Sequence, residues 1–159
     1  MASRLGEIVS MSALTWSGYN NSGIAAVAIG MTLNHCHSLT LSKALLVMPL
    51  VMHTPTVKYL ANGNTRSREI SSLTAIRPDF VHNFSQRYHA SLIHTINGLQ
   101  LLHSLDFIIY NDVIFQTKVF EAGPEFGKRV ELITAASREI SHLLKSSEEE
   151  LYLNLRVQL

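Results

Sequence analysis

Apolar residues recur at helical spacing through most of the chain. They predict a first helix over residues 23–35 and a second that begins at Leu41. Apolar side chains cover every face of the second helix, so we expect it to lie at the centre of the fold or against a partner. Pro49 predicts a kink in this helix, and Pro55 limits how far it can continue. One more turn is expected at Thr56–Leu60.

The strongest helical signal is a stripe of apolar side chains that step by four, four, four, four and three residues. It predicts a long helix over residues 78–103, with Pro78 at the first position. The stripe consists of Phe80, Phe84, Tyr88, Leu92, Ile96 and Leu99.

Two strands are predicted next, over residues 106–110 and 113–120, joined by a tight turn at Asn111–Asp112. An isolated hairpin is marginally stable in water. We therefore expect it to pack on the helices, to pair with a third strand, or both. Residues 35–38 are expected to be a connector.

A further helix is predicted over residues 127–145. The tail is open to two interpretations. Leucines at alternate positions from Leu151 favour a strand, whereas Ser147 followed by three glutamates is typical of a helix start. We favour a short helix.

The order of elements predicts a mostly helical α+β fold with a winged-helix-like core, one β-hairpin as the wing and a C-terminal helix. We expect a single domain over residues 1–159. It would comprise an N-terminal arm or short helix (1–21), the winged-helix-like core (22–120) and a C-terminal helical segment (121–159).

Composition adds an expectation about partners. Of the 159 residues, 47% are hydrophobic and only 16% are charged, against about 25% charged in an average domain. The mean hydropathy is +0.15. So few charges leave apolar surface uncovered, which usually marks an interface, so we interpret the chain as a subunit. A net charge of +1 gives no strong field for nucleic acid.

The sequence favours a cytoplasmic location without a membrane anchor. Its single cysteine, Cys36, can form no internal disulfide, which fits a reducing compartment. The N-terminus lacks the apolar core of a signal peptide. The longest apolar run, Ala44–Met52, is far shorter than the ~20 residues that cross a bilayer.

Candidate catalytic chemistry is sparse. His35, Cys36 and His37 offer three ligand types within three residues, but structural zinc normally takes four ligands from two separated pairs. The sequence contains no zinc-protease, nucleophile-elbow or phosphate-loop motif. We therefore expect no catalytic residues, no metal and no cofactor.

The cations suggest a limited DNA contact. Lys58, Arg66 and Arg68 cluster around one polar loop, and Lys118 lies on the expected wing. Three or four phosphate contacts would give weak, salt-sensitive binding. A solvated loop explains the same cluster equally well.

The second helix carries a resemblance. Leu45–Thr56, with its Met-Pro-Leu-Val-Met-His stretch, resembles the signature region of the middle component of ABC three-component systems. Phe84 and Arg87 further on are similar to the later family pattern. Val57 departs from it, because the family usually has arginine there.

The resemblance implies a non-catalytic adaptor encoded beside an SMC-, Rad50- or RecF-like ABC ATPase and an effector, often a nuclease. The Lamassu anti-phage systems are the best-known members. The expected contact residues are Pro49, His53, Thr56, Lys58, Arg66, Arg68 and Lys118.

Two other functions compete with this one. A stand-alone winged-helix DNA-binding regulator would need a basic recognition helix, but the predicted long helix carries just Arg87 between Phe80 and His103. A small metal-dependent enzyme would have to be built around His35–His37.

Overall fold

The computed structural model describes residues 21–63 and 69–159. The arm predicted over residues 1–21 therefore falls outside the described residues except for its last position. Arg66 and Arg68 also lie outside them.

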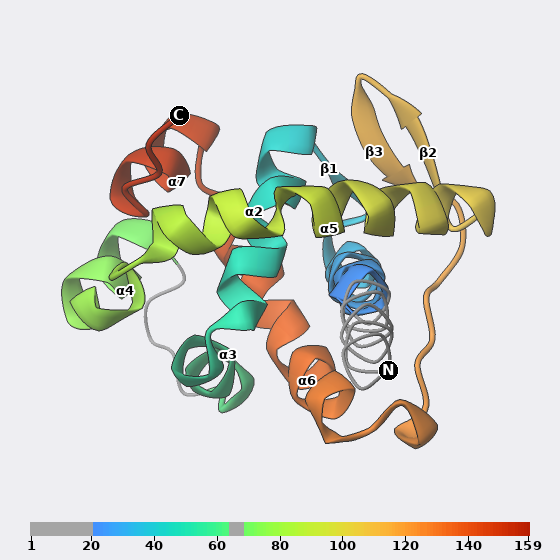
Figure 1. Ribbon diagram of the computed structural model, residues 1–159, viewed down its shortest axis with the longest axis horizontal. Coiled ribbons are helices and arrows are strands. Elements are labelled where there is room, and N and C mark those ends of the chain that lie inside the picture. Colours follow the sequence, from blue (N-terminus) through green and yellow to red (C-terminus); the bar gives the residue numbers. More distant parts are fainter. Residues whose placement is uncertain (1–20, 64–68) are drawn as a thin grey trace, which may run out of the picture.

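The chain is mostly helical with one small sheet, as predicted (Figure 1). A first helix occupies residues 21–36 of the described part. The elements that follow are β1 (Ser38–Leu39), α2 (Leu41–Met52), α3 (Thr54–Ala61), α4 (Ile70–Ile76), the 3₁₀ turn η1 (Pro78–Phe80), α5 (Phe84–Ser104), β2 (Ile108–Asn111), β3 (Val113–Gln116), the 3₁₀ turn η2 (Pro124–Phe126), α6 (Lys128–Leu143) and α7 (Glu148–Asn154).

The predicted hairpin pairs with a third strand. The sheet is antiparallel with the order β1-β3-β2, and Ser38 of the segment expected to be a connector lies opposite Phe115 of β3. The second strand ends at Gln116, four residues earlier than predicted. Its continuation leaves the sheet because Asn34 holds the backbone of Phe120: Oδ1 accepts from the Phe120 N–H at 3.0 Å, and Nδ2 donates to the Phe120 carbonyl at 2.8 Å.

Helix α2 is central, as its uniformly apolar surface predicted. Thr40 caps it, and seven of its residues are buried, Pro49 among them. It packs against α5, while α3 packs against α6. The helix runs through Pro49 to Met52, and the large change of direction follows it: α2 and α3 are bent by 100°.

The long helix begins later than predicted. Asn83 adopts the left-handed conformation, with φ 59°, and this interrupts the helix between η1 and Phe84. The stripe of large apolar side chains is only partly its buried face, since Phe84 and Tyr88 are buried but Ile96 is 37% exposed. Steps of four drift around a helix with 3.6 residues per turn. The buried face instead steps by four and three through Phe84, Tyr88, Ser91, Thr95, Gly98 and Leu102.

Small residues in the middle of this face allow α5 to cross the first helix closely. A Cβ at Gly98 would lie 2.8 Å from the backbone nitrogen of Ala26 and 3.0 Å from Cβ of Ala25. Gly30 on the same first helix makes room for Phe120, whose Cγ would lie 2.6 Å from a Cβ there. At Gly98, the backbones of α5 and the first helix therefore lie closer together than a larger side chain would allow.

The C-terminal part confirms two predictions. Helix α6 (Lys128–Leu143) lies within the range predicted for it. The tail forms the short helix α7, not a strand, and Ser147 and Glu150 form a capping box at its start. Helix α4 was not predicted, because its seven residues, Ile70–Ile76, are too few to display a period.

Within residues 21–63 and 69–159, no single helix is long and apolar enough to cross a membrane. Only α2 and α3 taken together reach that length and hydropathy, and the two are sharply bent.

Candidate functional site

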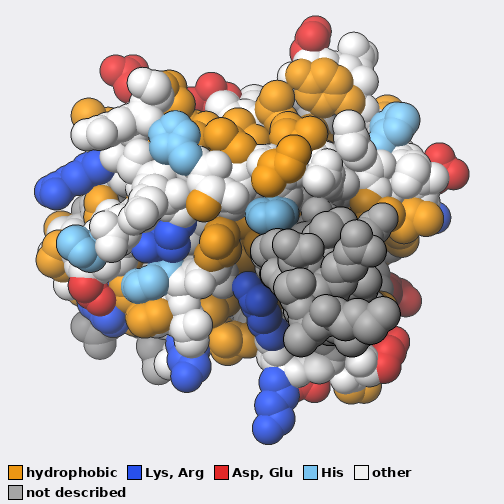
Figure 2. Space-filling model, in the orientation of Figure 1, with side chains coloured by type: hydrophobic (Ala, Val, Ile, Leu, Met, Phe, Trp, Pro, Cys, Tyr) orange, Lys and Arg blue, Asp and Glu red, His pale blue; other side chains and the backbone are white. Residues whose placement is uncertain are grey.

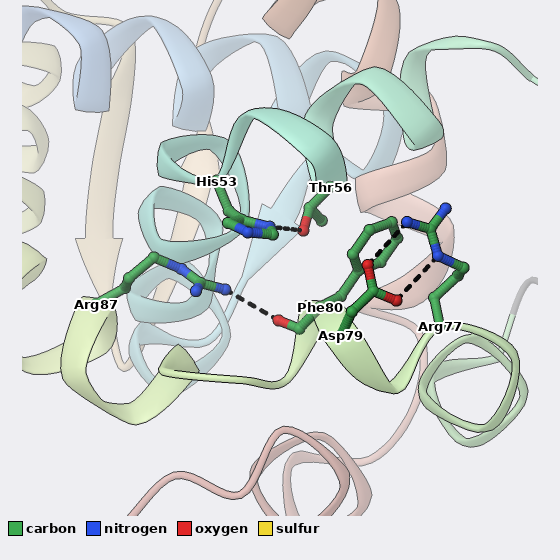
Figure 3. A network of polar contacts seen from close by, with 6 residues as sticks. All are labelled: His53, Thr56, Arg77, Asp79, Phe80 and Arg87. Atoms are coloured by element: carbon green, nitrogen blue, oxygen red, sulfur yellow. Dashed lines mark hydrogen bonds and ion pairs between the residues drawn. The ribbon is translucent and has the colours of Figure 1, made fainter.

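The segment Leu45–Thr56, which carries the family resemblance, includes the junction between α2 and α3, where the chain turns at His53 (Figure 3). We call this junction the elbow. Proline has no N–H to donate inside α2, and the last carbonyls of a helix have no partner within it. Pro55 in the first turn of α3 sets the start of the new helix. The sequence thus ends one helix and begins another within two residues.

Arg87 of α5 binds this elbow to the segment that precedes α5. Its Nε donates to the carbonyl of Pro49 at 3.2 Å, and its two terminal nitrogens donate to the carbonyls of His82 at 2.9 Å and Phe80 at 3.0 Å. A guanidinium can hold three carbonyls at once because its five N–H groups are fixed in one plane. Its positive charge also faces the negative end of α2.

His53 and Thr56 form the inner side of the elbow. Nδ1 of His53 lies 2.7 Å from Oγ1 of Thr56, a hydrogen bond to a fully buried hydroxyl. The His53 ring also meets Phe80 edge-on, with centroids 6.1 Å apart. Burial, with the charge of Arg87 adding to it, lowers the pKa of His53 from its ordinary value. The geometry therefore favours the neutral imidazole.

The ion pair of Arg77 and Asp79 covers the outer side of the elbow. Arg77 binds both carboxylate oxygens of Asp79, at 3.0 and 2.8 Å, and its guanidinium lies 4.1 Å from the centroid of the Phe80 ring. Tyr59 of α3 packs edge-on against the same ring. The hydrogen bond from Arg77 lowers the pKa of the Asp79 carboxyl. Phe80 is thus held between α3 and this ion pair.

The structure brings together three of the predicted contact residues and separates the others. Pro49, His53 and Thr56 meet at the elbow. Lys58 is exposed on α3, and Lys118 lies two residues after β3, a strand that Figure 1 shows well away from α3. Nζ of Lys118 lies 4.4 Å from the centroid of the Phe107 ring. The predicted cations therefore form no single patch among the described residues.

Arg87 is the contact that sequence reasoning did not place at the site. It lies 38 residues from Pro49, and spacing alone cannot pair them. The sequence pointed to Arg87 only through the family resemblance, which included this residue but implied no contact for it.

The His35–Cys36–His37 segment does not gather its side chains. Nδ1 of His37 lies 3.1 Å from Oε1 of Gln116, whereas Sγ of Cys36 donates to the carbonyl of Thr32 at 3.4 Å. Burial raises the pKa of the Cys36 thiol, which disfavours the nucleophilic thiolate. In the described part of the chain, no three His, Cys, Asp or Glu side chains are placed to hold a metal ion.

The elbow is therefore built to hold elements in position. Its polar groups bind backbone carbonyls or one another. Fold and site define a small, mostly helical α+β protein with an internally clamped helix junction.

Comparison with known families agrees with this description. Residues 24–159 match the family model of the ABC-three component (ABC-3C) system Middle Component 3, and the chain belongs to this family. No curated protein and no solved structure matches the chain.

Proposed function

We propose that the chain is a non-catalytic adaptor of an anti-phage defence complex. It would couple an SMC- or Rad50-like ABC ATPase to an effector such as a nuclease, as in Lamassu-like systems. The observation that carries the proposal is the match of residues 24–159 to the middle component family. Membership of this family implies partnership with other components of the system. The role of coupling the ATPase to the effector is the part that we add.

The surface of the molecule supports a role in binding protein. Figure 2 shows hydrophobic side chains gathered over α5 and the base of the hairpin, while most Lys and Arg lie on the lower half of this face. Ile93 is 60% exposed and Tyr110 is 58% exposed. Exposed apolar side chains gathered on one face in this way are typical of an interface.

A winged-helix-like core fits the order of the elements. A helix, a short strand and further helices precede the hairpin, and the hairpin's second strand lies between the other two. Under this proposal α5 would be the helix that leads into the wing, with α3 and α4 inserted before it. The single domain would include α7, because Tyr152 donates to the carbonyl of Ser42 at 2.6 Å.

The stand-alone DNA-binding regulator gains no support. Arg87 is the one Lys or Arg in α5, and its guanidinium is engaged by three carbonyls. That leaves α5 without a free Lys or Arg for phosphates or base edges, so any DNA contact would be weak and made through the complex.

Co-purification tests the proposal. The chain, carrying an affinity tag, is co-expressed with the ATPase and the effector encoded beside it. We expect both to co-purify with it, and we expect effector activity to require the chain as well as ATP. A chain that elutes alone, with an effector that works equally well without it, would contradict the adaptor role.

A further inference from the structure

Strand β2 is an edge of the sheet with a free row of backbone groups. In the order β1-β3-β2 it is hydrogen-bonded to β3 alone. The N–H of Thr117 donates to the carbonyl of Phe107 at 2.8 Å, which makes this pair a hydrogen-bonded one. Bonded and non-bonded pairs alternate along an antiparallel ladder. Ile109 and Asn111 therefore bond to β3, whereas the backbone N–H and C=O groups of Ile108 and Tyr110 point away from it.

These outward groups have no partner in the described chain. Neither Ile108 nor Tyr110 makes a backbone hydrogen bond to another described residue on that side. Proteins usually protect such an edge with lysine, proline or a bulge. The Ile-Ile-Tyr-Asn sequence of β2 has none of these, and its Ile109 and Tyr110 are more than half exposed.

An apolar hollow of about 340 Å³ lies beside this edge, between α5 and the sheet. Strand residues on one face of β2 line it, as do apolar residues of α5, and no Lys, Arg, Asp or Glu is among its lining residues. Its lining is Leu41, Ile96, Leu99, Gln100, His103, Ile108, Tyr110 and Ile114. A strand added to β2 would point every second side chain toward this face. Edge hydrogen bonds with a pocket for alternate side chains are the features of β-strand addition.

The two ends of the edge carry acidic residues. Asp106 lies two residues before β2 and Asp112 directly follows it, and both are exposed. Neither forms an ion pair with another described residue. Figure 2 shows acidic atoms at the hairpin tip. The charges complement a segment with Lys or Arg at its ends.

The same charges disfavour a second copy of the chain. The antiparallel self-pairing that uses all four outward groups is centred on Ile109. It places Asp106 of one copy opposite Asp112 of the other, and like charges directly opposite each other destabilise a pair of strands.

We propose that β2 accepts an extended segment of another component of the complex as a fourth strand. The segment has apolar side chains on the face toward the hollow and Lys or Arg at its ends. This inference rests on the proposed function, because it takes the partner from the same complex.

Proline at Tyr110 tests the edge directly. The Tyr110 N–H points away from β3, so Tyr110→Pro removes an outward donor without removing a hydrogen bond to β3. Tyr110→Thr is the matched control, because it removes the ring and keeps the donor. We expect Tyr110→Pro to weaken assembly at least about tenfold and Tyr110→Thr to weaken it less. Equal assembly by Tyr110→Pro and the unchanged chain would overturn the inference.

Amide hydrogen exchange on the unchanged chain gives a second measurement that does not depend on a variant folding. On assembly, the Tyr110 amide should exchange at least about tenfold more slowly, while the Ile109 amide changes little. An assembled complex with unaltered Tyr110 exchange would overturn the strand addition and leave the adaptor role standing. Failure to assemble at all would overturn both.

Two further experiments test the charge of the partner and the self-association of the chain. Asp106→Asn with Asp112→Asn keeps side chains that tolerate a positive φ, which both positions adopt, and should weaken assembly several-fold at low salt but not at high salt. An effect independent of salt would overturn the basic character of the partner. Protection of Tyr110 that rises with the concentration of the free chain would identify a second copy as the occupant, and would overturn the proposed one.

Discussion

Nε of Arg87 lies 3.2 Å from the carbonyl oxygen of Pro49, so a side chain from α5 completes the end of α2. The two residues are separated by 38 positions in the sequence, yet their contact joins α5 to the end of α2. The remaining nitrogens of the guanidinium hold the segment that enters α5.

Replacing this guanidinium should destabilise the fold. Arg87→Lys keeps the charge, but one ammonium cannot match the planar fork that holds three carbonyls. We expect a loss of about 1.5–3 kcal/mol in the free energy of unfolding, the range for hydrogen bonds to a charged group. Arg77→Lys, at an exposed ion pair, is the control and should destabilise the fold clearly less. Urea unfolding measures both, and equal losses would contradict the clamp.

The elbow should make stability depend on pH. The pKa of His53 is lowered in the fold below its ordinary value of 6.5, so the unfolded chain binds a proton more readily. Its contribution is complete above pH 6.5 and is lost as pH falls through 6.5 toward the folded-state pKa. His35 is shifted in the same direction. His53→Asn should therefore reduce the slope of stability against pH in this window without abolishing it, as measured by urea unfolding at several pH values.

The crossing of α5 and the first helix should not tolerate a methyl group. Gly98→Ala would place Cβ 2.8 Å from a backbone nitrogen, and we expect a cost of about 1–3 kcal/mol, although alanine favours helices. Gly23→Ala is the matched control, because its Cβ would meet nothing within 4 Å. It should be neutral or stabilise by up to about 1 kcal/mol. Thermal unfolding compares the two variants, and the midpoint temperature should fall for Gly98→Ala but not for Gly23→Ala.

A buried hydroxyl on the same helix face should be dispensable. Thr95 is fully buried, and its Oγ1 has no hydrogen-bond partner among the described residues. Thr95→Val keeps the shape and removes the unsatisfied group, so we expect a gain of up to about 1–2 kcal/mol. Ser91 donates to the carbonyl of Tyr88 at 3.0 Å, so Ser91→Ala should bring no such gain. Unfolding in denaturant compares them.

Lys118→Glu separates folding from DNA contact. Its ammonium lies over the Phe107 ring at an exposed position, so the change should cost less than about 1 kcal/mol of stability. If the assembled complex holds a phosphate here, the salt dependence of DNA binding should fall by about one contact. An unchanged salt slope, measured by DNA titration over a range of salt, would remove Lys118 from any DNA surface.

Local patterns predicted much of this fold. The uniformly apolar α2, the capping signal at Ser147 and the hairpin turn each depend on neighbouring residues, and each was recovered. The start of α5 was missed because it depends on the left-handed Asn83, and β1 because two residues become a strand only when β3 lies beside them.

The candidate site, too, was predictable where its residues are neighbours in the sequence and not where they meet through tertiary contacts. Pro49, His53 and Thr56 lie within eight residues and could be grouped from the sequence. Arg87 belongs with them through a tertiary contact, which no spacing reveals.

Helix α5, which is about 30 Å long, is pinned where Gly98 meets the first helix, two thirds of the way along its length. The hairpin is attached about 9 Å beyond this point, and Arg87, which holds the elbow, lies about 17 Å before it. The helix therefore has the geometry of a lever with unequal arms, and a tilt of the hairpin end would move the Arg87 end roughly twice as far in the opposite direction.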